Sequence, residues 1–470
     1  MRLILDRFPV QWRPVVVIAA GVLIEISLGI SFSIGNLIPY IISYIHQTDP
    51  SMDYTLSTWL GALNSLSYGI AVLITGYVES KIGLKLTVLT GSIIGSGFIA
   101  VSYFTIQHGF WPFTATYSLA YGLGAGLVYI VPLIAVSKWV PQRKGFASGC
   151  ILAGFAAGAI LWDQVETLFI NPSDIKPDLK IGENRYFTDE ALLHRVPQCF
   201  VVLGVATLAI QLIGCLILAE PSQEDYTYSA SRLQQTDKAK ETEREIGPKK
   251  MFTTYAFYVL TLTYGSTSFA MAIHNSLWKA FGNVFDYGDM FLAATGSTSS
   301  VFNTLGRLFW GYLADYYSYQ ALMTTITALT GIFMVTILLT AVTGQAFYFI
   351  WVCGICFFYS GAPTLIPVGI ARCFGARYFG LNCSFIYVGD TIAGILSAVT
   401  TQMLMNLVHY QGMYLLAGCF PFIAGLSFCT IDSACALSMS ITCSKYGHLH
   451  KSTLLPEEHS LDRDEYTAIP

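Results

Sequence analysis

Long apolar stretches recur along the whole chain and are separated by short polar segments. Each is about 20 residues or longer, which lets an α-helix cross roughly 30 Å of hydrocarbon with its backbone groups satisfied. The expected spans are 15–45, 59–78, 85–106, 111–139, 146–169, 198–219, 252–280, 289–312, 320–343, 346–370, 380–408 and 413–437. The pattern predicts an all-α membrane protein with 12 transmembrane helices.

Two polar segments divide the chain. Residues 220–251 are charged and poor in aliphatic side chains, as is typical of a flexible linker. Residues 438–470 form a second polar segment at the end of the chain. The expected organisation is an N-terminal six-helix bundle over 1–219, a linker over 220–251, a C-terminal six-helix bundle over 252–437 and a tail over 438–470.

The composition excludes several classes of function. The chain is 54% hydrophobic and 11% charged, against about 25% charged residues in a soluble domain. No basic stripe indicates a nucleic-acid partner. No nucleotide-binding loop, nucleophile–base pair or metal-ligand cluster is visible in the sequence, so we expect neither an enzyme nor a cofactor. Cys353 and Cys356 form a CxxC without a nearby histidine, which favours buried small side chains over a metal site.

The distribution of lysine and arginine predicts the orientation of the chain in the membrane. With a cytoplasmic N-terminus, the inside segments contain the linker and Lys81, Lys85, Lys138, Arg143, Lys144, Arg372 and Arg377. Among the outside loops, 46–58, 107–110, 344–345 and 409–412 contain no lysine or arginine. Both termini, the linker and the tail are therefore expected in the cytoplasm.

The two halves are related in sequence. At one offset of 235 residues, GALNSLSYGIAVLITGY (61–77) aligns with GSTSSVFNTLGRLFWGY (296–312), and the same offset places Pro132 on Pro367 and Gly145 on Gly380. Such a repeat is typical of transporters in which two bundles surround a central cavity and move as rigid bodies to give alternating access. The sequence therefore predicts two six-helix pseudo-repeats around a central cavity.

Several motifs resemble those of the major facilitator superfamily. GYVESKIGLK (76–85) resembles a degenerate form of the family loop G-x-x-x-D-[RK]-x-G-[RK], with Ser80 in the place of the aspartate. GRLFWGYLADYYS (306–318) is its second-half counterpart and retains Asp315. Within the superfamily, GLGAGLVYIVPLIAVSKWVPQRKGFASGCILAGFAAGA (122–159) resembles the oxalate:formate antiporter group and its monocarboxylate-transporter relatives.

This resemblance implies a substrate and a site. Members of the group move small carboxylates, and the position that matches their substrate-binding basic residue in span eight is Arg307. Antiporters for oxalate have a lysine in span eleven, where this chain has Asp390, within YVGDTIAG; the inverted charge argues against oxalate. The resemblance also implies an inner gate at Lys138, Arg143, Lys144 and Asp315.

Three charged residues fall near one depth in the membrane. Arg307 lies eight residues before Asp315, or about 12 Å from the inner end of its helix. Asp390 and Glu25 each lie ten residues inside their spans, or about 15 Å deep. A guanidinium does not lose its proton, so it needs an anion, and its forked donors suit a carboxylate.

Three interpretations of these charges are open. Arg307 could form a permanent ion pair with Asp390 or Glu25 that locks the helices. Alternatively, Arg307 attracts the substrate carboxylate while a buried acid takes up a proton, with Asp390 favoured over Glu25 as the proton site. In the third interpretation the two acids hold a cationic substrate.

Other polar residues within the spans are candidates with structural alternatives. Asn303, one helical turn before Arg307, could orient the guanidinium or form a helix–helix hydrogen bond. Tyr129 and Tyr387 could offer hydroxyl groups to the substrate. For Asp163 and Glu166 an interfacial polar face is favoured over a vestibule, and for His274 a packing role is favoured over a proton relay.

We therefore expect a secondary active transporter of small monocarboxylates of the pyruvate, lactate and formate class, coupled to protons. The alternatives are an organic-anion exchanger, a carrier of another small solute, and a solute receptor on the same fold that does not transport. The expected partners are a small organic anion, protons and the lipid bilayer, and some monocarboxylate carriers of this kind need a single-span accessory protein. Tyr466–Ile469 matches a Y-x-x-Φ sorting signal, which favours the plasma membrane, with endosomes or lysosomes as the alternative.

Overall fold

The computed structural model describes residues 4–50, 52, 56–140, 143–173, 175–181, 184–225, 227, 245–285, 287–375 and 377–429. Within these ranges the chain is helical almost throughout, which confirms the predicted all-α class. One antiparallel hairpin, β1 (Leu179–Ile181) with β2 (Asn184–Tyr186), interrupts the helices. The tail predicted over 438–470 and most of the linker lie outside the described residues.

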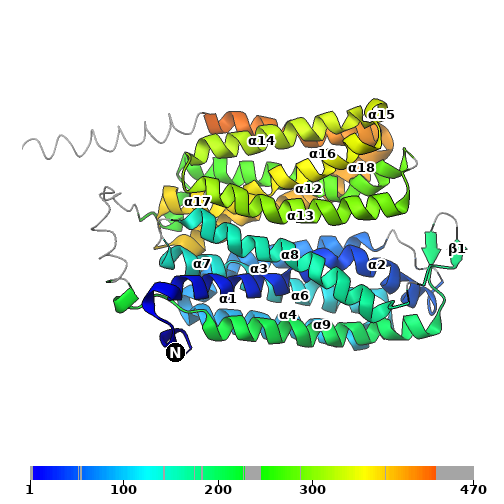
Figure 1. Cartoon of the computed structure of the whole chain (residues 1–470), viewed down its shortest axis with the longest axis horizontal. Coiled ribbons are helices and arrows are strands. Elements are labelled where there is room, and N and C mark those ends of the chain that lie inside the picture. The colour runs from blue at the N-terminus through cyan, green and yellow to red at the C-terminus, as the bar shows by residue number, and fades with distance from the viewer. Residues whose placement is uncertain are drawn as a thin grey trace, which may run out of the picture.

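The first half of the chain forms one bundle, called here the N bundle (Figure 1). Its helices are α1 (Arg13–Leu28), α2 (Ile30–His46), α3 (Thr58–Ile82), α4 (Leu84–Thr105), α5 (Phe110–Thr114), α6 (Tyr121–Tyr129), α7 (Val131–Trp139), α8 (Lys144–Ile170) and α9 (Glu190–Ile217). Short 3₁₀ turns and a π-helical segment at Ala115–Ala120 connect some of them. The first expected span is thus broken at Gly29 into α1 and α2, and the Trp162 indole donates to the Ile26 carbonyl at this break over 2.8 Å.

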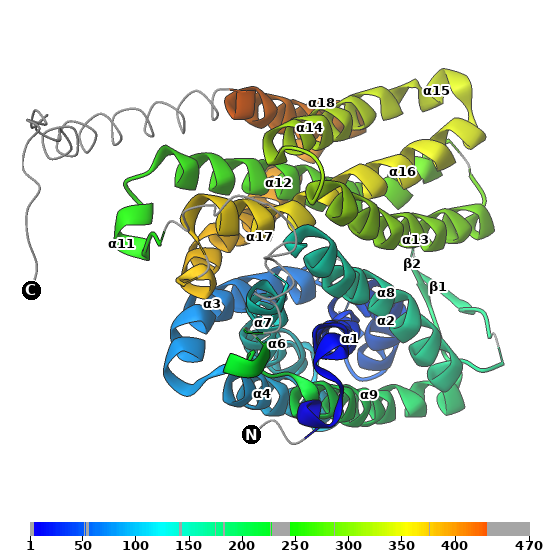
Figure 2. The same ribbon diagram turned by 60° about the vertical axis from the view of Figure 1, so that its left-hand side comes forward.

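The second half forms the C bundle, which lies beside the N bundle in both views (Figures 1 and 2). Its helices are α11 (Pro248–Met251), α12 (Tyr255–Asn283), α13 (Asp289–Ala314), α14 (Tyr319–Thr336), α15 (Thr340–Thr343), α16 (Gln345–Tyr359), α17 (Gly361–Phe374) and α18 (Phe379–Cys429). α18 covers the eleventh expected span and most of the twelfth. A break in the backbone at His409, whose φ is 54°, separates the two. The end of the twelfth expected span, 430–437, lies outside the described residues.

Eleven helical segments among the described residues are long and apolar enough to cross a membrane, so the chain is a multi-pass membrane protein. The expected span that is not among these eleven is the eighth, 289–312, which corresponds to α13; this helix has 26 residues but is more polar than the other long helices. Its polar residues include Asn303 and Arg307, and it packs directly against α8 of the other bundle. A helix that faces protein on one side does not need an apolar surface all round.

The bundles approach each other most closely at one end. We call this the linker end; it contains Gly83, Arg143, Asp315 and Gly375, and it lies opposite the hairpin end with β1 and β2 (Figure 1). A Cβ atom added to Gly145 would lie 2.6 Å from the Gly311 carbonyl oxygen, and one added to Gly76 would lie 2.5 Å from the Gly380 carbonyl oxygen. Such distances are shorter than real Cβ contacts, so only glycine allows this approach.

These two contacts reproduce the sequence repeat in three dimensions. The offset of 235 residues that aligns the halves takes Gly76 to Gly311 and Gly145 to Gly380. The helix pairs α8/α13 and α3/α18 are therefore equivalent crossings between the bundles. At the other end of α3, by contrast, an added Cβ at Gly61 would have no heavy atom within 4 Å.

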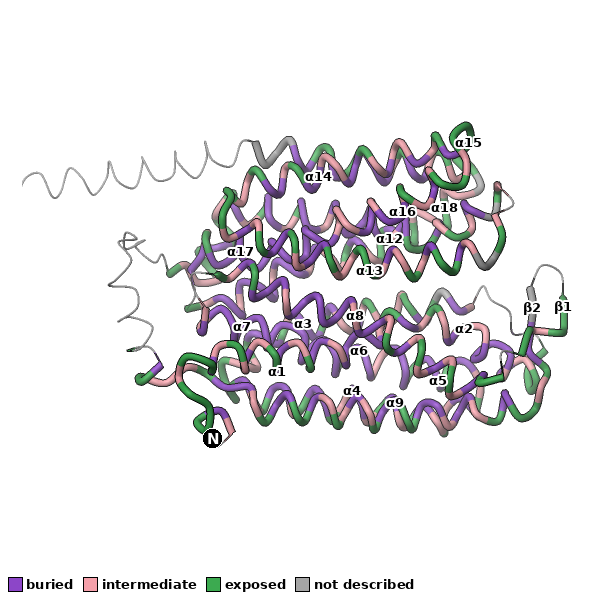
Figure 3. Tube along the Cα trace, in the orientation of Figure 1, coloured by how far each residue is buried: buried purple, intermediate pink, exposed green. Residues whose placement is uncertain are grey.

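The buried apolar residues also show that the two bundles are in contact. One continuous core extends from the N bundle into the C bundle through Trp310, Leu365, Phe374 and Tyr387. A second core, which includes Phe281, Tyr348 and Tyr414, belongs to the C bundle alone. Figure 3 shows the buried residues gathered where the helices face one another. The bundles are thus joined through a shared core in this conformation.

Gly145→Ala should separate the bundles at the linker end, because the new methyl group would meet the Gly311 carbonyl oxygen and the Ala314 Cβ of α13. Spin labels at Ser80 and Tyr317, both exposed and on different bundles, should then show a longer and broader distance distribution. The matched control is Gly61→Ala, which should leave the distance unchanged and raise the free energy of unfolding by about 0.5–1 kcal/mol. An unchanged distribution in Gly145→Ala would contradict the closed contact.

Candidate functional site

Arg307 lies in the second half of α13, toward its end at Ala314, with only 3% of its surface exposed. Its Nε donates a hydrogen bond of 3.0 Å to Oδ1 of Asn303, one helical turn earlier. Because Asn303 is a neutral amide, this bond orients the guanidinium without neutralising it. The side chain is therefore held in place but keeps its full positive charge.

The rest of the guanidinium faces an aromatic ring and an open hydrogen-bonding position. Its central carbon lies 6.0 Å from the ring centroid of Phe155, on α8 of the other bundle. Nη1 is buried and has no hydrogen-bond partner among the residues that the structure describes. In the described part of the chain no carboxylate lies within 4.0 Å of Arg307. The permanent ion pair considered from the sequence is thus not formed in this conformation.

Glu25, near the end of α1, is the acid that interacts with this charge. Its side chain is fully buried, and within the described ranges neither carboxyl oxygen has a hydrogen-bond partner. It is electrostatically attracted to Arg307, although the two do not come within ion-pair distance. An acid and a base that are both buried and incompletely partnered are rare, because each costs several kcal/mol when left alone.

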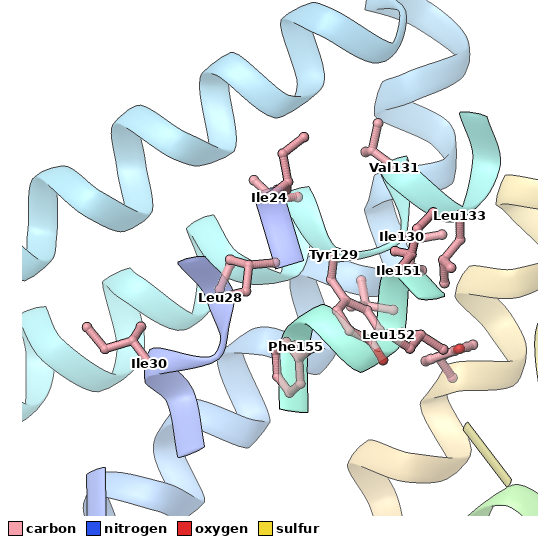
Figure 4. Packing of buried hydrophobic residues seen from close by; sticks show 14 of the residues in the cluster. Ile24, Leu28, Ile30, Tyr129, Ile130, Val131, Leu133, Ile151, Leu152 and Phe155 are labelled. Carbon is pink, nitrogen blue, oxygen red and sulfur yellow. The ribbon is translucent and has the colours of Figure 1, made fainter. Parts of the chain in front are cut away.

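Tyr129 and Tyr387 meet across the two bundles. Their rings lie edge to face with centroids 6.0 Å apart, and both side chains are buried. Tyr129 also packs edge to face on Phe155 at 5.5 Å, and Figure 4 shows these two rings close together. The Tyr387 hydroxyl is buried without a partner. The aromatic groups thus form a wall beside the guanidinium and add one free donor to it.

Asp390 lies on α18, next to this wall. It is half-buried, it lies beside Ser268 of α12, and it is close enough to Tyr264 and Tyr387 to act on them electrostatically. Arg307 acts electrostatically on Glu25, and both Arg307 and Asp390 act on Tyr129 and Tyr387. The three charges predicted near one depth therefore do gather at the bundle interface, with Glu25 coupled to Arg307 and Asp390 facing tyrosines.

The sequence did not single out Phe155, which carries the ring against Arg307. A signal was available, because the offset of 235 residues aligns Phe155 with Asp390. Equivalent positions of the two halves thus contribute an aromatic ring from one bundle and a carboxyl group from the other.

The four predicted gate residues fall into two places at the linker end. Backbone N–H groups of Gly145 and Phe146 donate to the two carboxylate oxygens of Asp315 at 2.9 and 3.0 Å. This places a carboxylate of the C bundle on the positive N-terminus of α8, next to Arg143 and Lys144. Burial raises the pKa of the Asp315 carboxyl, against the opposing effect of these two donors.

Lys138 is not part of the Asp315 contact, because its ion pairs lie within the first half of the chain. Its ammonium group lies 3.7 Å from Glu79 and also contacts Glu220, just after α9. Ser80 is the residue of the first half that the internal repeat aligns with Asp315. It lies near the α3/α18 crossing and donates a hydrogen bond to the Tyr77 carbonyl of its own helix. There the bundles are joined instead by a 3.1 Å bond from the Gly76 N–H to the Ser384 hydroxyl.

The weaker candidates lie inside single bundles. Glu166 is fully buried and accepts hydrogen bonds from Ser33 at 2.6 Å and Asn36 at 3.2 Å, which join α8 to α2. His274 is buried in the C bundle beside the Tyr414 hydroxyl. No group of three or more potential metal ligands occurs in the part of the chain that the structure describes.

Comparison with known proteins identifies relatives over most of the chain. Residues 18–165 match the model of the Major Facilitator Superfamily. Apicoplast pyruvate carrier 1 of Toxoplasma gondii is 23% identical over 486 aligned positions, which cover 89% of each chain. The oxalate:formate antiporter of Oxalobacter formigenes is 22% identical over 66% of this chain and 67% of its own.

Solved structures show the same fold at lower identity. The proton:xylose symporter XylE aligns with a TM-score of 0.69 at 12% identity, over 89% of this chain and 95% of its own. FucP in its outward conformation aligns with a TM-score of 0.62 at 13% identity, over 88% of this chain and 99% of its own. The Major Facilitator Superfamily model thus matches a segment within the N bundle, and the fold along both bundles is that of solved major facilitator superfamily transporters.

Proposed function

We propose that the chain is a secondary active transporter of small monocarboxylates of the pyruvate, lactate and formate class, coupled to protons. The observation that carries the proposal is the buried, uncompensated guanidinium of Arg307. A substrate carboxylate would supply the missing anion and accept two parallel hydrogen bonds from it. Arg307, Asn303, Tyr129 and Tyr387 are the proposed substrate-binding residues.

The surroundings of Arg307 favour a small anion. Phe155, Tyr129 and Tyr387 place aromatic rings next to the guanidinium, and the buried Tyr387 hydroxyl has no partner among the described residues. Such a site suits an anion with one carboxylate and a short remainder. The names of two relatives, Apicoplast pyruvate carrier 1 and the oxalate:formate antiporter, support small carboxylates as the class.

Proton coupling follows from the position of Glu25. A substrate carboxylate on Arg307 would be repelled by an ionised Glu25, and burial disfavours the ionised form of a carboxyl group. Proton and anion would therefore load together and cross with little net charge. The sequence favoured Asp390 for this role; the electrostatic link to Arg307 makes Glu25 the stronger candidate, with Asp390 second.

Alternating access would open the linker end, which we place in the cytoplasm. The Asp315 contact with α8, next to Arg143 and Lys144, would break and re-form in each cycle. Lys138 would act from within the N bundle through Glu79 and Glu220. We place the protein in the plasma membrane, with endosomes or lysosomes as the alternative. A single-span accessory protein is a further candidate partner. The likeness to the oxalate:formate antiporter makes anion exchange the second candidate function.

Uptake of labelled pyruvate, lactate and formate into proteoliposomes tests the proposal. We expect an inward proton gradient to drive accumulation of at least one of them, and uptake to fall as the external pH rises, because the proton is a co-substrate. Vesicles with the gradient collapsed by a protonophore are the control. Counterflow without any gradient effect would favour the exchanger, and failure of all three anions with folded protein would contradict a monocarboxylate substrate.

Arg307→Ala should lower uptake at least about thirtyfold, as expected when one partner of a buried charge pair is removed. Arg307→Lys should retain intermediate activity, because it keeps the charge but loses the forked donors. Both variants are compared at equal amounts of monodisperse protein. Wild-type uptake by a folded Arg307→Ala would remove Arg307 from the site.

Glu25→Gln should abolish stimulation by the proton gradient while leaving exchange of anion for anion, because the amide cannot release a proton. Asp390→Asn undergoes the same two assays. Glu166→Gln is the matched control, since Glu166 is equally buried but is hydrogen-bonded to Ser33 and Asn36, and it should keep gradient-driven uptake. A wild-type pH profile in Glu25→Gln together with a flat one in Asp390→Asn would assign the proton to Asp390.

A further inference from the structure

A polar hollow opens at the linker end, and Arg307 is not among the residues that line it. Its volume is about 870 Å³, and it lies between the α3–α4 turn, the end of α7, the segment after α9 and the turn before α18. Four basic side chains line it: Lys81, Lys85, Lys138 and Arg377. The proposed transport cycle gives Lys81, Lys85 and Arg377 no role; they contribute to the orientation of the chain, which does not require them to line one hollow.

The hollow has more positive than negative charge. Its two carboxylates, Glu79 and Glu220, are both engaged by Lys138. Within the described part of the chain, neither Lys81 nor Lys85 forms an ion pair. The Lys81 Nζ lies 5.7 Å from the centroid of the Tyr77 ring. The Lys85 Nζ donates one of its three hydrogens to the Leu216 carbonyl oxygen, 2.8 Å away. Both lysines therefore retain donors for an anion.

One side of the hollow is apolar and faces outward. Ile82 and Leu86 belong to its lining and are 42% and 54% exposed. Further exposed apolar side chains continue this surface along the same two helices, at Ile74 on α3 and Ile93 on α4. In a membrane-spanning chain such a surface contacts acyl chains. A basic hollow that opens onto lipid-facing helices suits a ligand with an anionic head and apolar tails.

Arg377 brings the second bundle into this hollow. It lies just before α18, and its present partner is Glu245, 2.8 Å away. Both side chains of this pair are about half exposed or more, at 62% and 47%, and exposed pairs of this kind are weak. A stronger anion in the hollow could therefore contact Arg377 of the C bundle and Lys81 or Lys85 of the N bundle together.

We propose that this hollow binds the phosphorylated headgroup of an anionic phospholipid. Lys81 and Lys85 hold the phosphate, the acyl chains lie against Ile82 and Leu86, and Arg377 closes the site from the other bundle. The bound lipid then favours the closed linker end, because separating the bundles would remove Arg377 from the headgroup. The proposal does not depend on which solute the carrier transports.

Native mass spectrometry of the full chain tests the proposal. The protein is incubated in mixed micelles with phosphatidylinositol 4-phosphate or with phosphatidylcholine, and the retained lipid is measured. The test variant is Lys81→Gln/Lys85→Gln. The matched control is Lys249→Gln/Lys250→Gln, which removes the same charge from exposed lysines of α11 that do not line the hollow. Thermal unfolding of each variant checks that it is folded.

We expect the wild type and the control to prefer the phosphoinositide, and the test variant to lose this preference by roughly thirtyfold. Equal retention by the test variant would overturn the site. An equal loss in the control would also overturn it, because charge alone would then explain binding. Soluble inositol 1,4-bisphosphate is added as a competitor; if it binds as tightly as the lipid, the ligand is a free phosphate compound and the assignment to a lipid fails.

Discussion

The arrangement at the centre of this protein depends on one buried guanidinium that forms no ion pair within the described residues. Arg307 is 3% exposed, its one side-chain hydrogen bond goes to the neutral Asn303, and Phe155 offers only the face of a ring. A charge in such surroundings is costly unless an anion joins it. A charge held inside the membrane at such a cost marks a functional site. The helices around it are closely packed, since a Cβ atom added to Gly149 would lie 2.6 Å from the Arg307 carbonyl oxygen.

That packing depends on small residues at the linker end. The crossings of α8 with α13 and of α3 with α18 both rely on glycine pairs related by the internal repeat. Duplication has nevertheless left the two crossings chemically different. One is closed by the Asp315 carboxylate on the N-terminus of α8, and the other by a bond from the Gly76 N–H to Ser384. Since the carboxylate contact is partly electrostatic, the two crossings should respond differently to charge in their surroundings.

The basic hollow extends this asymmetry to the membrane surface. It lies beside the α3–α4 turn and is lined in part by Ser80. The internal repeat aligns Ser80 with Asp315, so the first half has a serine where the second half has an aspartate. Without an acid at position 80, Lys81 and Lys85 keep their charge free for an external anion. The α3/α18 crossing would then be controlled by a lipid, and the α8/α13 crossing by the Asp315 side chain of the protein itself.

The sequence by itself determined the helical class, the position of most spans, the internal repeat and the presence of charges at Glu25, Arg307 and Asp390. These follow from hydropathy and residue identity, which act locally along the chain. Only the tertiary structure decided which groups meet: Glu25 couples to Arg307, Asp390 faces tyrosines, Phe155 lies against the guanidinium and Lys138 pairs within its own half. Residues far apart in sequence come together through helix rotation and crossing angles, and a rotation of a fraction of a turn changes the partner of a buried charge without changing the apolar pattern that defines the span.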